Sequence, residues 1–339
     1  MHKLSRIMVV AVACVMLLRS ADAFWWFNRP RIAPAEQVYA RTNETVAVTD
    51  RLRVATYNLE HLNDGINDGP TNTLELARAH AQAAAAILER INPDVVFFQE
   101  VENEDALRLI NNTLRRPYPL GFITRYQDKT GRPDPLNIAV LSRIPLAQVR
   151  TIAFDTLSRS SRPPRGVLAA TVDLGPDRKL LLYGVHLKSN FGNKERNQAQ
   201  RVKTMEIVRA DVQQVLARNP QSQWEVAVAG DMNVDPDNEE FREDPSLTPF
   251  RDWIDLWRGR PIGERATCPT RYGDPSLVFP PASFDRVLVS PELVEEPWVA
   301  LPLTALPMGV NTNLVAVLPG QDGHVSDHYP VYLDLRREP

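Results

Sequence analysis

Cysteine is scarce in this chain of 339 residues, which contains only Cys14 and Cys268. Two cysteines so far apart exclude a scaffold held by several disulfides and a zinc site built from several cysteines. An excess of basic residues is also missing, because 39 Lys and Arg are set against 42 Asp and Glu, for a net charge of −3. This balance excludes the strong overall positive field of a non-specific DNA-binding protein and leaves room only for a local basic groove.

The apolar run at the start of the chain is short. It covers residues 7–18, follows two basic residues and precedes an Ala-Asp-Ala motif that ends at Ala23. Because a bilayer span needs about 20 apolar residues, we favour a cleaved signal peptide over residues 1–23 rather than a transmembrane anchor or a lipoprotein attached at Cys14. We therefore expect an exported protein, periplasmic or extracellular. Cleavage would remove three basic residues and one acid, so the net charge would become −5.

The rest of the chain has the composition of a soluble globular protein, with 43% hydrophobic and 24% charged residues. Residues 24–50 show no clear periodicity and predict an extended leader. No repeat, low-complexity tract or change in composition follows, which indicates one domain over residues 51–337. Apolar runs predict strands at residues 52–59, 94–100, 137–143, 167–174, 179–187, 225–233, 283–290 and 330–335.

Two long segments have helical spacing. One runs from Leu74 to Ile91 and is capped by Asn72 with Glu75, and the other covers residues 195–218. Strands that follow one another in pairs outnumber helices, so a purely alternating parallel sheet fits poorly. We predict an α+β fold in which two packed, mainly antiparallel sheets are flanked by helices, a four-layer α/β/β/α sandwich.

Polar residues gather where these predicted strands end. The segment VAVAGDMNVDPDN, residues 226–238, ends an apolar run in three aspartates and two asparagines. A calcium-binding loop would need glycine and glutamate where Pro236 and Arg242 stand, so that reading is weak. We interpret Asp231 and Asn233 as catalytic residues and Asp235 as part of a turn.

Six such clusters occur in a fixed order: TYNLEH, FFQEVEN, YGVHLKSN, AGDMNVD, SFDRVLVS and HVSDHYPV. In this order they resemble the endonuclease/exonuclease/phosphatase superfamily, which has the DNase I-like fold. The resemblance covers residues 52–335, and its most specific parts are GDMN and SDHYPV. It implies a four-layer sandwich and a phosphodiesterase or phosphatase that depends on a divalent metal, similar to exported bacterial nucleases.

Hydrolysis of a phosphodiester requires a cation on a phosphoryl oxygen and an activated water. Glu100 is our principal candidate metal ligand, with Asn58 and Glu60 completing or orienting its surroundings and Asp327 as a further candidate. Carboxylate and amide oxygens suit Mg²⁺ or Mn²⁺.

For proton transfer we expect His328, oriented by Asp285, to activate the water. Asp231 is the alternative base, with protonation of the leaving oxygen as its other candidate role, and the sequence does not separate these roles. Asn233 is expected to orient the nucleophile. His186, when protonated, would donate to the phosphate.

Arg165 precedes a predicted strand and is our candidate phosphate-binding residue. Three other histidines, His61, His80 and His324, are not assigned to the site, and His80 is expected to be structural.

The signal peptide and the acidic charge argue against an intracellular DNA-repair role, and export favours an endonuclease-like enzyme acting on extracellular nucleic acid. A phospholipid phosphodiesterase of the sphingomyelinase type is the alternative, with the aromatic leader as a membrane contact. A secreted, non-catalytic binding module is a third possibility, but such a protein would be expected to have lost at least one of the motif residues. No obligate protein partner is implied.

Overall fold

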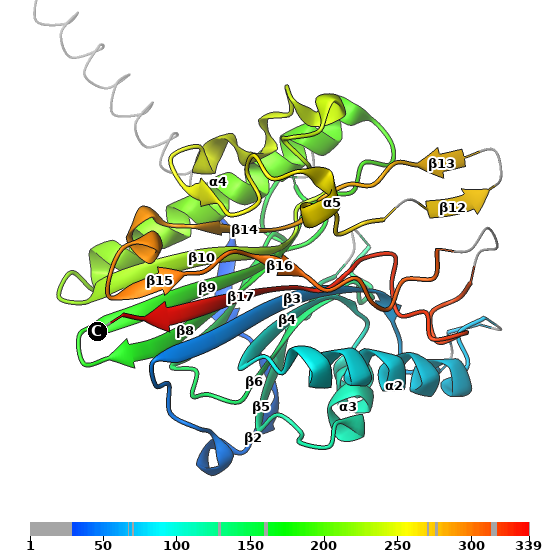
Figure 1. The fold of residues 1–339 in the computed structure, drawn as a ribbon, viewed down its shortest axis with the longest axis horizontal. Coiled ribbons are helices and arrows are strands. Elements are labelled where there is room, and N and C mark those ends of the chain that lie inside the picture. The colour runs from blue at the N-terminus through cyan, green and yellow to red at the C-terminus, as the bar shows by residue number, and fades with distance from the viewer. Residues whose placement is uncertain are drawn as a thin grey trace, which may run out of the picture.

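The structure is a computed structural model that describes residues 29–338, apart from residues 67, 70, 128–129, 159–161, 270, 275–276 and 313–316. The predicted signal peptide, residues 1–23, lies outside the described residues. Figure 1 shows two large sheets packed face to face, with helices on the outside. No helix among the described residues is both long enough and apolar enough to cross a membrane.

The first sheet contains β1 (Arg31–Pro34), β7 (Gln148–Ala153), β8 (Val167–Gly175), β9 (Arg178–His186), β10 (Gln223–Asp231), β14 (Asp285–Val289) and β11 (Ile254–Asp255), in this spatial order. The second contains β15 (Trp298–Ala300), β17 (Val331–Arg337), β3 (Arg51–Leu62), β4 (Val95–Val101), β6 (Asn137–Ser142), β5 (Leu120–Ile123) and β2 (Glu36–Ala40), with β16 (Thr304–Ala305) also paired to β17. β9 is parallel to β10, and β3 is parallel to β4. A separate hairpin pairs β12 (Arg271–Asp274) with β13 (Leu277–Phe279).

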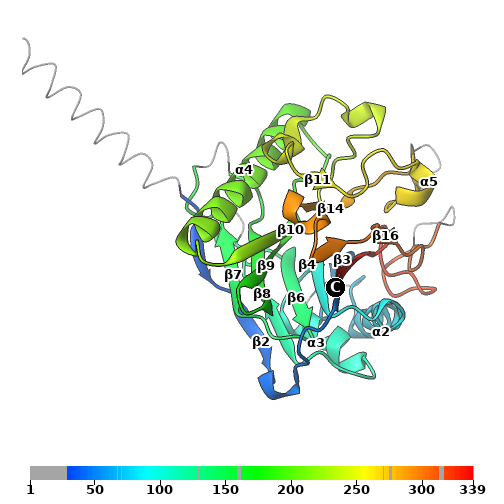
Figure 2. The ribbon, with the colours of Figure 1, turned by 60° about the vertical axis from the view of Figure 1, so that its left-hand side comes forward.

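Helices cover both outer faces. α2 (Leu74–Ile91) and α3 (Glu104–Thr113) pack on the second sheet, and α4 (Lys194–Arg218) packs on the first (Figure 2). Shorter elements are α5 (Ile262–Arg265) and the 3-10 helices η1 (Thr42–Glu44), η2 (Glu239–Phe241), η3 (Pro245–Phe250) and η4 (Pro291–Val294). The predicted α+β four-layer sandwich is confirmed.

The central strands are apolar on both faces because each face is covered. In β4, Val95 and Phe97 point to the other sheet, whereas Val96 and Phe98 point to α2 and α3. The sheets approach so closely that a Cβ on Gly184 would lie 2.3 Å from the Phe97 ring. Burial on both faces explains why these strands read as continuous apolar runs.

Two local predictions need correction. The helix at residue 74 is capped by Thr73, whose hydroxyl accepts a hydrogen bond from the Leu76 amide, and not by Asn72. Within the segment predicted as a leader, residues 31–34 pair with β7 and residues 36–40 pair with β5. The folded unit therefore includes residues before position 51, and one short stretch of chain forms an edge strand of each sheet.

Candidate active site

The predicted site residues meet where the two pairs of parallel strands end. In the first sheet, Asp231 at the end of β10 is in register with His186 on one side and with Asp285 on the other. In the second sheet, Asn58 on β3 is in register with Gln99, the residue before Glu100. Because parallel neighbours end at the same edge of a sheet, the topology brings these polar side chains together.

The backbone is strained at this edge. Positive φ angles occur at four residues of the site region: Glu60 (44°), His61 (61°), Glu100 (64°) and Asn233 (52°). The pairing of β3 with β4 shifts register between Asn58 and Leu62, as a β-bulge does. Such conformations cost about 1–3 kcal/mol each in residues other than glycine. They re-aim the side chains of the strand ends, and strain concentrated in this way is typical of functional sites.

Gly230 allows β10 to reach this edge. Its φ is 148°, and a Cβ at this position would lie 2.0 Å from the carbonyl oxygen of Val185 on β9. Only glycine permits such a close approach. The next residue, Asp231, is therefore fixed against β9 by the backbone itself.

The amide of Asn58 joins the two sheets. Its Nδ2 lies 3.3 Å from Oε1 of Glu100 and 3.2 Å from Oδ2 of Asp231. The second oxygen of Glu100 accepts a hydrogen bond of 3.1 Å from the backbone amide of His61. Glu100 and Asp231 are thus held on either side of one buried amide.

Asp231 is buried and surrounded by neutral donors. Asn233 donates to it twice, from its backbone amide and from its side chain, both at 2.9 Å. Burial raises the pKa of Asp231 to about 7, although the nearby charge of His328 acts in the opposite direction. The side chain of Asn233, predicted to orient the nucleophile, donates to Oδ2 of Asp231.

His328 and Asp285 form the predicted pair. Nδ1 of His328 lies 2.6 Å from Oδ2 of Asp285, which is completely buried. Burial acts to lower the pKa of His328, but the adjacent Asp285 carboxylate outweighs it and raises that pKa well above its usual value. His328 is therefore an imidazolium at neutral pH. On its other side, Nε2 lies 3.7 Å from Oδ1 of Asp327.

His186 lies between the two carboxylates. Its Nε2 is 3.6 Å from Oε1 of Glu100 and 3.5 Å from Oδ2 of Asp231. Burial, followed by the charge of Arg165, lowers the pKa of His186 well below its usual value. The imidazole is thus neutral at pH 7 and keeps a single N–H, whereas its predicted role requires protonation.

Glu60 differs from its predicted environment. Its Oε2 lies 3.0 Å from Nε2 of His324, a residue that the sequence prediction left out of the site. The backbone amide of Glu60 donates to Oδ1 of Asn58. Glu60 therefore supports Asn58 through the backbone, while its carboxylate contacts His324.

Arg165 has side-chain N–H donors without hydrogen-bond partners in the described part of the chain. Its Nε and Nη1 are buried and, among the described residues, have no hydrogen-bond partner. After burial, its charge is the next cause that lowers the pKa of both His186 and Lys188. Two buried N–H groups without partners in the described structure are suited to an anion such as phosphate, because leaving such donors unpaired is costly.

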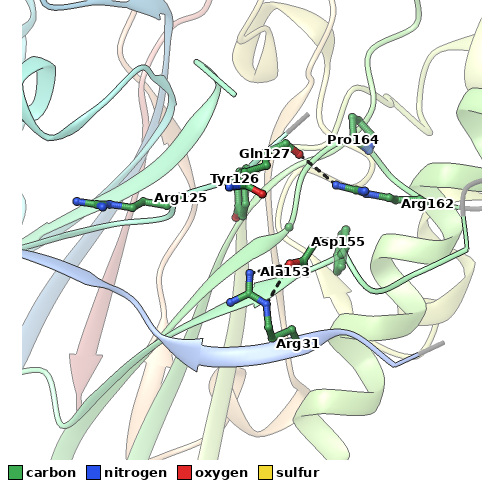
Figure 3. A pocket seen from close by; sticks show the side chains of 10 residues that line it. Arg31, Arg125, Tyr126, Gln127, Ala153, Asp155, Arg162 and Pro164 are labelled. Atoms are coloured by element: carbon green, nitrogen blue, oxygen red, sulfur yellow. Dashed lines mark hydrogen bonds and ion pairs between the residues drawn. The ribbon is translucent and has the colours of Figure 1, made fainter. Parts of the chain in front are cut away.

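A small hollow lies beside Arg165 but differs from the site. Figure 3 shows its lining, which includes Arg31, Arg162 and the flanking residue Pro164. Arg31 is already paired with Asp155, and Arg162 donates to the carbonyl of Gln127. A larger hollow of about 540 Å³ adjoins it, lined in part by Glu102, Thr124, Arg125, Tyr126 and Asn137. These arginines are therefore not free phosphate ligands, whereas the larger hollow has room for part of a substrate.

The sequence profile of the Endonuclease/Exonuclease/phosphatase family matches residues 55–328. The chain belongs to this family. No curated protein matches the sequence significantly. The family hydrolyses phosphoesters, generally with a divalent metal, and the predicted membership is confirmed.

Solved structures of family members share the fold at low sequence identity. TDP2 of D. rerio, complexed with single strand DNA product, is 18% identical with a TM-score of 0.56, covering 85% of this chain and 100% of its own. Sphingomyelinase C from Streptomyces griseocarneus is 20% identical with a TM-score of 0.58, covering 84% and 99%. A mannosyl-6-phosphatase from Bacteroides thetaiotaomicron is 17% identical with a TM-score of 0.56, also covering 84% and 99%.

The residues present fit the divalent metal used by this family. Glu100 has a partly exposed carboxylate whose oxygens face an amide, a backbone N–H and imidazoles, with no Lys or Arg nitrogen of the described residues within 4.0 Å. Glu100 and Asn58 offer oxygen ligands, the type that Mg²⁺ and Mn²⁺ prefer. When bound, such an ion supplies positive charge to a phosphoryl oxygen.

The sequence prediction missed residues that contact the site. His61 lies 3.5 Å from Glu100, His324 contacts Glu60, and Cys268 lies 3.3 Å from Nδ1 of His328. The position of His61 directly after TYNLE was an available signal. Cys268 gave none, because it follows an irregular segment 60 residues before its partner.

Proposed function

We propose that this protein is an exported, divalent-metal-dependent phosphodiesterase that cleaves nucleic acid in the manner of an endonuclease. The observation that supports this best is the single buried amide of Asn58 between Glu100 and Asp231. The proposal extends the hydrolysis of phosphoesters, which the family performs, to a substrate class, a metal and a location.

The proton-transfer roles follow from the charge states. A general base works best when its pKa is near the working pH, and Asp231, with a pKa of about 7, meets that condition. His328, held as an imidazolium by Asp285, is suited to donate a proton toward a phosphoryl oxygen rather than to accept one. We therefore assign proton transfer with water or the leaving oxygen to Asp231, and stabilisation of charge to His328.

Two further groups act on the phosphate. Arg165 brings unmet N–H donors, and charge-assisted hydrogen bonds to phosphate are about twice as strong as neutral ones. Neutral His186 is able to donate one hydrogen bond from a position between both carboxylates. Together these donors offset the negative charge that grows on the phosphoryl group as the reaction proceeds.

The surroundings of the site favour a long substrate. The hollow of about 540 Å³ is lined by Glu102, two residues after Glu100, and adjoins the hollow that Pro164 and Gly166 line on either side of Arg165. A chain of nucleotides whose reacting phosphate lies on Arg165 would extend into this space.

One feature favours phospholipid as the second candidate. The hairpin of β12 and β13 pairs only with itself among the described strands and projects from the sandwich in Figure 1. Phe279 at its base is 41% exposed. Phe191 is 77% exposed and follows Asn190, whose side-chain amide donates to the Asn233 carbonyl. Exposed apolar side chains of this kind are suited to a lipid surface.

The decisive experiment is a substrate panel. The purified protein would be given supercoiled plasmid, structured RNA and sphingomyelin vesicles, each with Mg²⁺, with Mn²⁺ and with a chelator, and His328→Ala would control for contaminating enzymes. We expect metal-dependent nicking of plasmid that the control lacks. Hydrolysis of sphingomyelin without cleavage of either nucleic acid would overturn the proposed substrate.

Export has a separate test. Expression of the full chain, followed by fractionation and N-terminal sequencing of the product, should recover protein that begins at residue 24 outside the cytoplasm. Recovery of the uncleaved chain in the cytoplasm would contradict the proposed location and leave the substrate proposal unaffected.

A further inference from the structure

We propose that Cys268, His328 and Asp285 form a second metal site, selective for an ion of the zinc class, and that its occupation inhibits the enzyme. The site is distinct in chemistry from the oxygen ligands around Glu100. It uses a thiol that has no part in the proposed reaction.

The three side chains already have the spacing of ligands. The Sγ of Cys268 lies 3.3 Å from Nδ1 of His328, which lies 2.6 Å from Oδ2 of Asp285, and one ligand atom from each residue falls within 4.8 Å of the others. In a tetrahedral site with Zn–S of about 2.3 Å and Zn–N of about 2.0 Å, sulfur and nitrogen are separated by about 3.5 Å. A small opening of the pair formed by His328 and Asp285 would admit the ion.

A second observation points to a ligand. Asp285 is 0% exposed, and its Oδ1 is buried without any hydrogen-bond partner among the described residues. A buried carboxylate oxygen with no donor is unfavourable unless a cation or donor completes it. Cys268 itself is partly exposed, so the three side chains lie close to the protein surface.

The thiol is held in place by the backbone. Cys268 exchanges two hydrogen bonds of 2.9 Å with Ala282, and the amide of Tyr329 donates to the carbonyl of Thr267. The hydroxyl of Thr267 accepts hydrogen bonds from the backbone amides of Phe284 and Asp285. The segments that bear all three ligands are thereby tied together before any ion arrives, which lowers the cost of binding.

The ligand types decide which ion is preferred. A thiolate, an imidazole and a carboxylate suit Zn²⁺ or Co²⁺, whereas Mg²⁺ prefers oxygen alone. Binding would displace two protons, one from Sγ of Cys268 and one held between His328 and Asp285, and these leave to solvent. The ion would then occupy Nδ1 of His328 and separate it from Asp285, which breaks the pair of His328 and Asp285 on which the proposed chemistry depends.

Cobalt spectroscopy tests the site without requiring activity. In a Cys14→Ser background, so that Cys268 is the sole thiol, Co²⁺ would be titrated into the protein in excess Mg²⁺. We expect a thiolate-to-cobalt charge-transfer band that disappears in Cys268→Ser and weakens in His328→Ala, with circular dichroism confirming that each variant is folded. Absence of the band, or its persistence in Cys268→Ser, would overturn the proposal.

Inhibition is the second measurement, and this part rests on the proposed function. With Mg²⁺ fixed, loss of the thiolate in Cys268→Ser should raise the Zn²⁺ concentration that halves each variant's own rate by about tenfold or more. Equal inhibition of both proteins would place the inhibitory ion elsewhere and contradict the proposal. A protein without activity on any substrate would still show the cobalt band, so failure of the function and failure of the site are distinguishable.

Discussion

Asp231 and Asp235 lie four residues apart, and both are buried, yet their surroundings are opposite. Asp235 is ion-paired with Arg265 and Arg286, each of which is at least 95% buried. Asp231 contacts only amides and an imidazole among the described residues, and burial raises its pKa to about 7. Arginines are thus packed around Asp235, whereas no Lys or Arg of the described residues forms an ion pair with Asp231.

This difference distinguishes a structural aspartate, Asp235, from a functional one, Asp231, at the end of the same strand. A buried carboxylate with two arginines is neutralised permanently and ties its segments together. Carboxylates without protein cations, such as Glu100 and Asp231, suit a site where positive charge arrives with a metal. The sequence interpretation of Asp235 as part of a turn is confirmed, because its carbonyl accepts a hydrogen bond from the Asn238 amide, but the interpretation did not include the two ion pairs.

The largest expected effect is a loss of hydrolysis rate when the charge of Glu100 or His328 is removed. Glu100→Gln keeps the shape of the side chain but loses its negative charge, and His328→Ala removes the imidazolium. We expect each to lower the rate of phosphoester hydrolysis by about 10² or more, because a positioned charge-stabilising or acid-base group is lost. Initial rates with Mg²⁺ measure this effect, and Asp173→Asn, on an exposed strand position, is the control. Near-normal rates in both variants would mean that the site lies elsewhere.

The second-largest expected effect is a loss of stability when Asp235 is removed. Asp235→Ala would leave Arg265 buried without a carboxylate partner among the described residues, which costs about 3–5 kcal/mol of unfolding free energy, whereas Arg286 keeps its pair with Asp255. Urea unfolding measures it. Asp173→Ala breaks an exposed pair with Lys179 and should cost about 1 kcal/mol or less. An equal loss of unfolding free energy in the two variants would contradict the proposed structural role of the buried Asp235.

The sequence predicted what depends on local pattern. The central strands and α2 were found because double-sided burial gives apolar runs and helical spacing gives a clear stripe. β1 and β2 were missed because they are edge strands with mostly exposed side chains, so pairing, and not burial, defines them. No apolar run marks such strands in the sequence.

Within the site, the motif residues were predictable and their partners were not. The pair of His328 with Asp285 follows from two recognisable segments. Glu60 and His324 are in contact although they are 264 positions apart in the sequence, and Asp235 and Arg286 are 51 positions apart. No rule of sequence spacing predicts either pair. Such partners depend on the sheet order, which the sequence pattern leaves undetermined.

Two buried histidines sharpen the comparison. His328 has a carboxylate partner and stays charged, whereas burial lowers the pKa of His80 in α2 to about 4. Between pH 6.5 and 4, His80 binds a proton in the unfolded chain but stays neutral in the folded protein. The free energy of unfolding therefore decreases as the pH falls, by up to about 3 kcal/mol. Urea unfolding from pH 7.5 to 4.5 should show a smaller loss in His80→Gln than in the unaltered protein. Parallel curves for the two proteins would contradict a neutral His80.

The smallest expected effect concerns Arg165, the candidate phosphate-binding residue. Arg165→Gln removes unmet donors and a charge, and loss of a charge-assisted hydrogen bond of about 1.5–3 kcal/mol predicts a decrease of about 10- to 100-fold in kcat/KM. Arg165→Lys should recover part of this through charge alone, because Lys cannot bind phosphate with a planar fork. Arg162→Gln is the matched control, since Arg162 already donates to the Gln127 carbonyl and should change kcat/KM little. An equal decrease in kcat/KM for Arg165→Gln and Arg162→Gln would mean that the adjacent hollow, and not the unpaired donors of Arg165, positions the substrate.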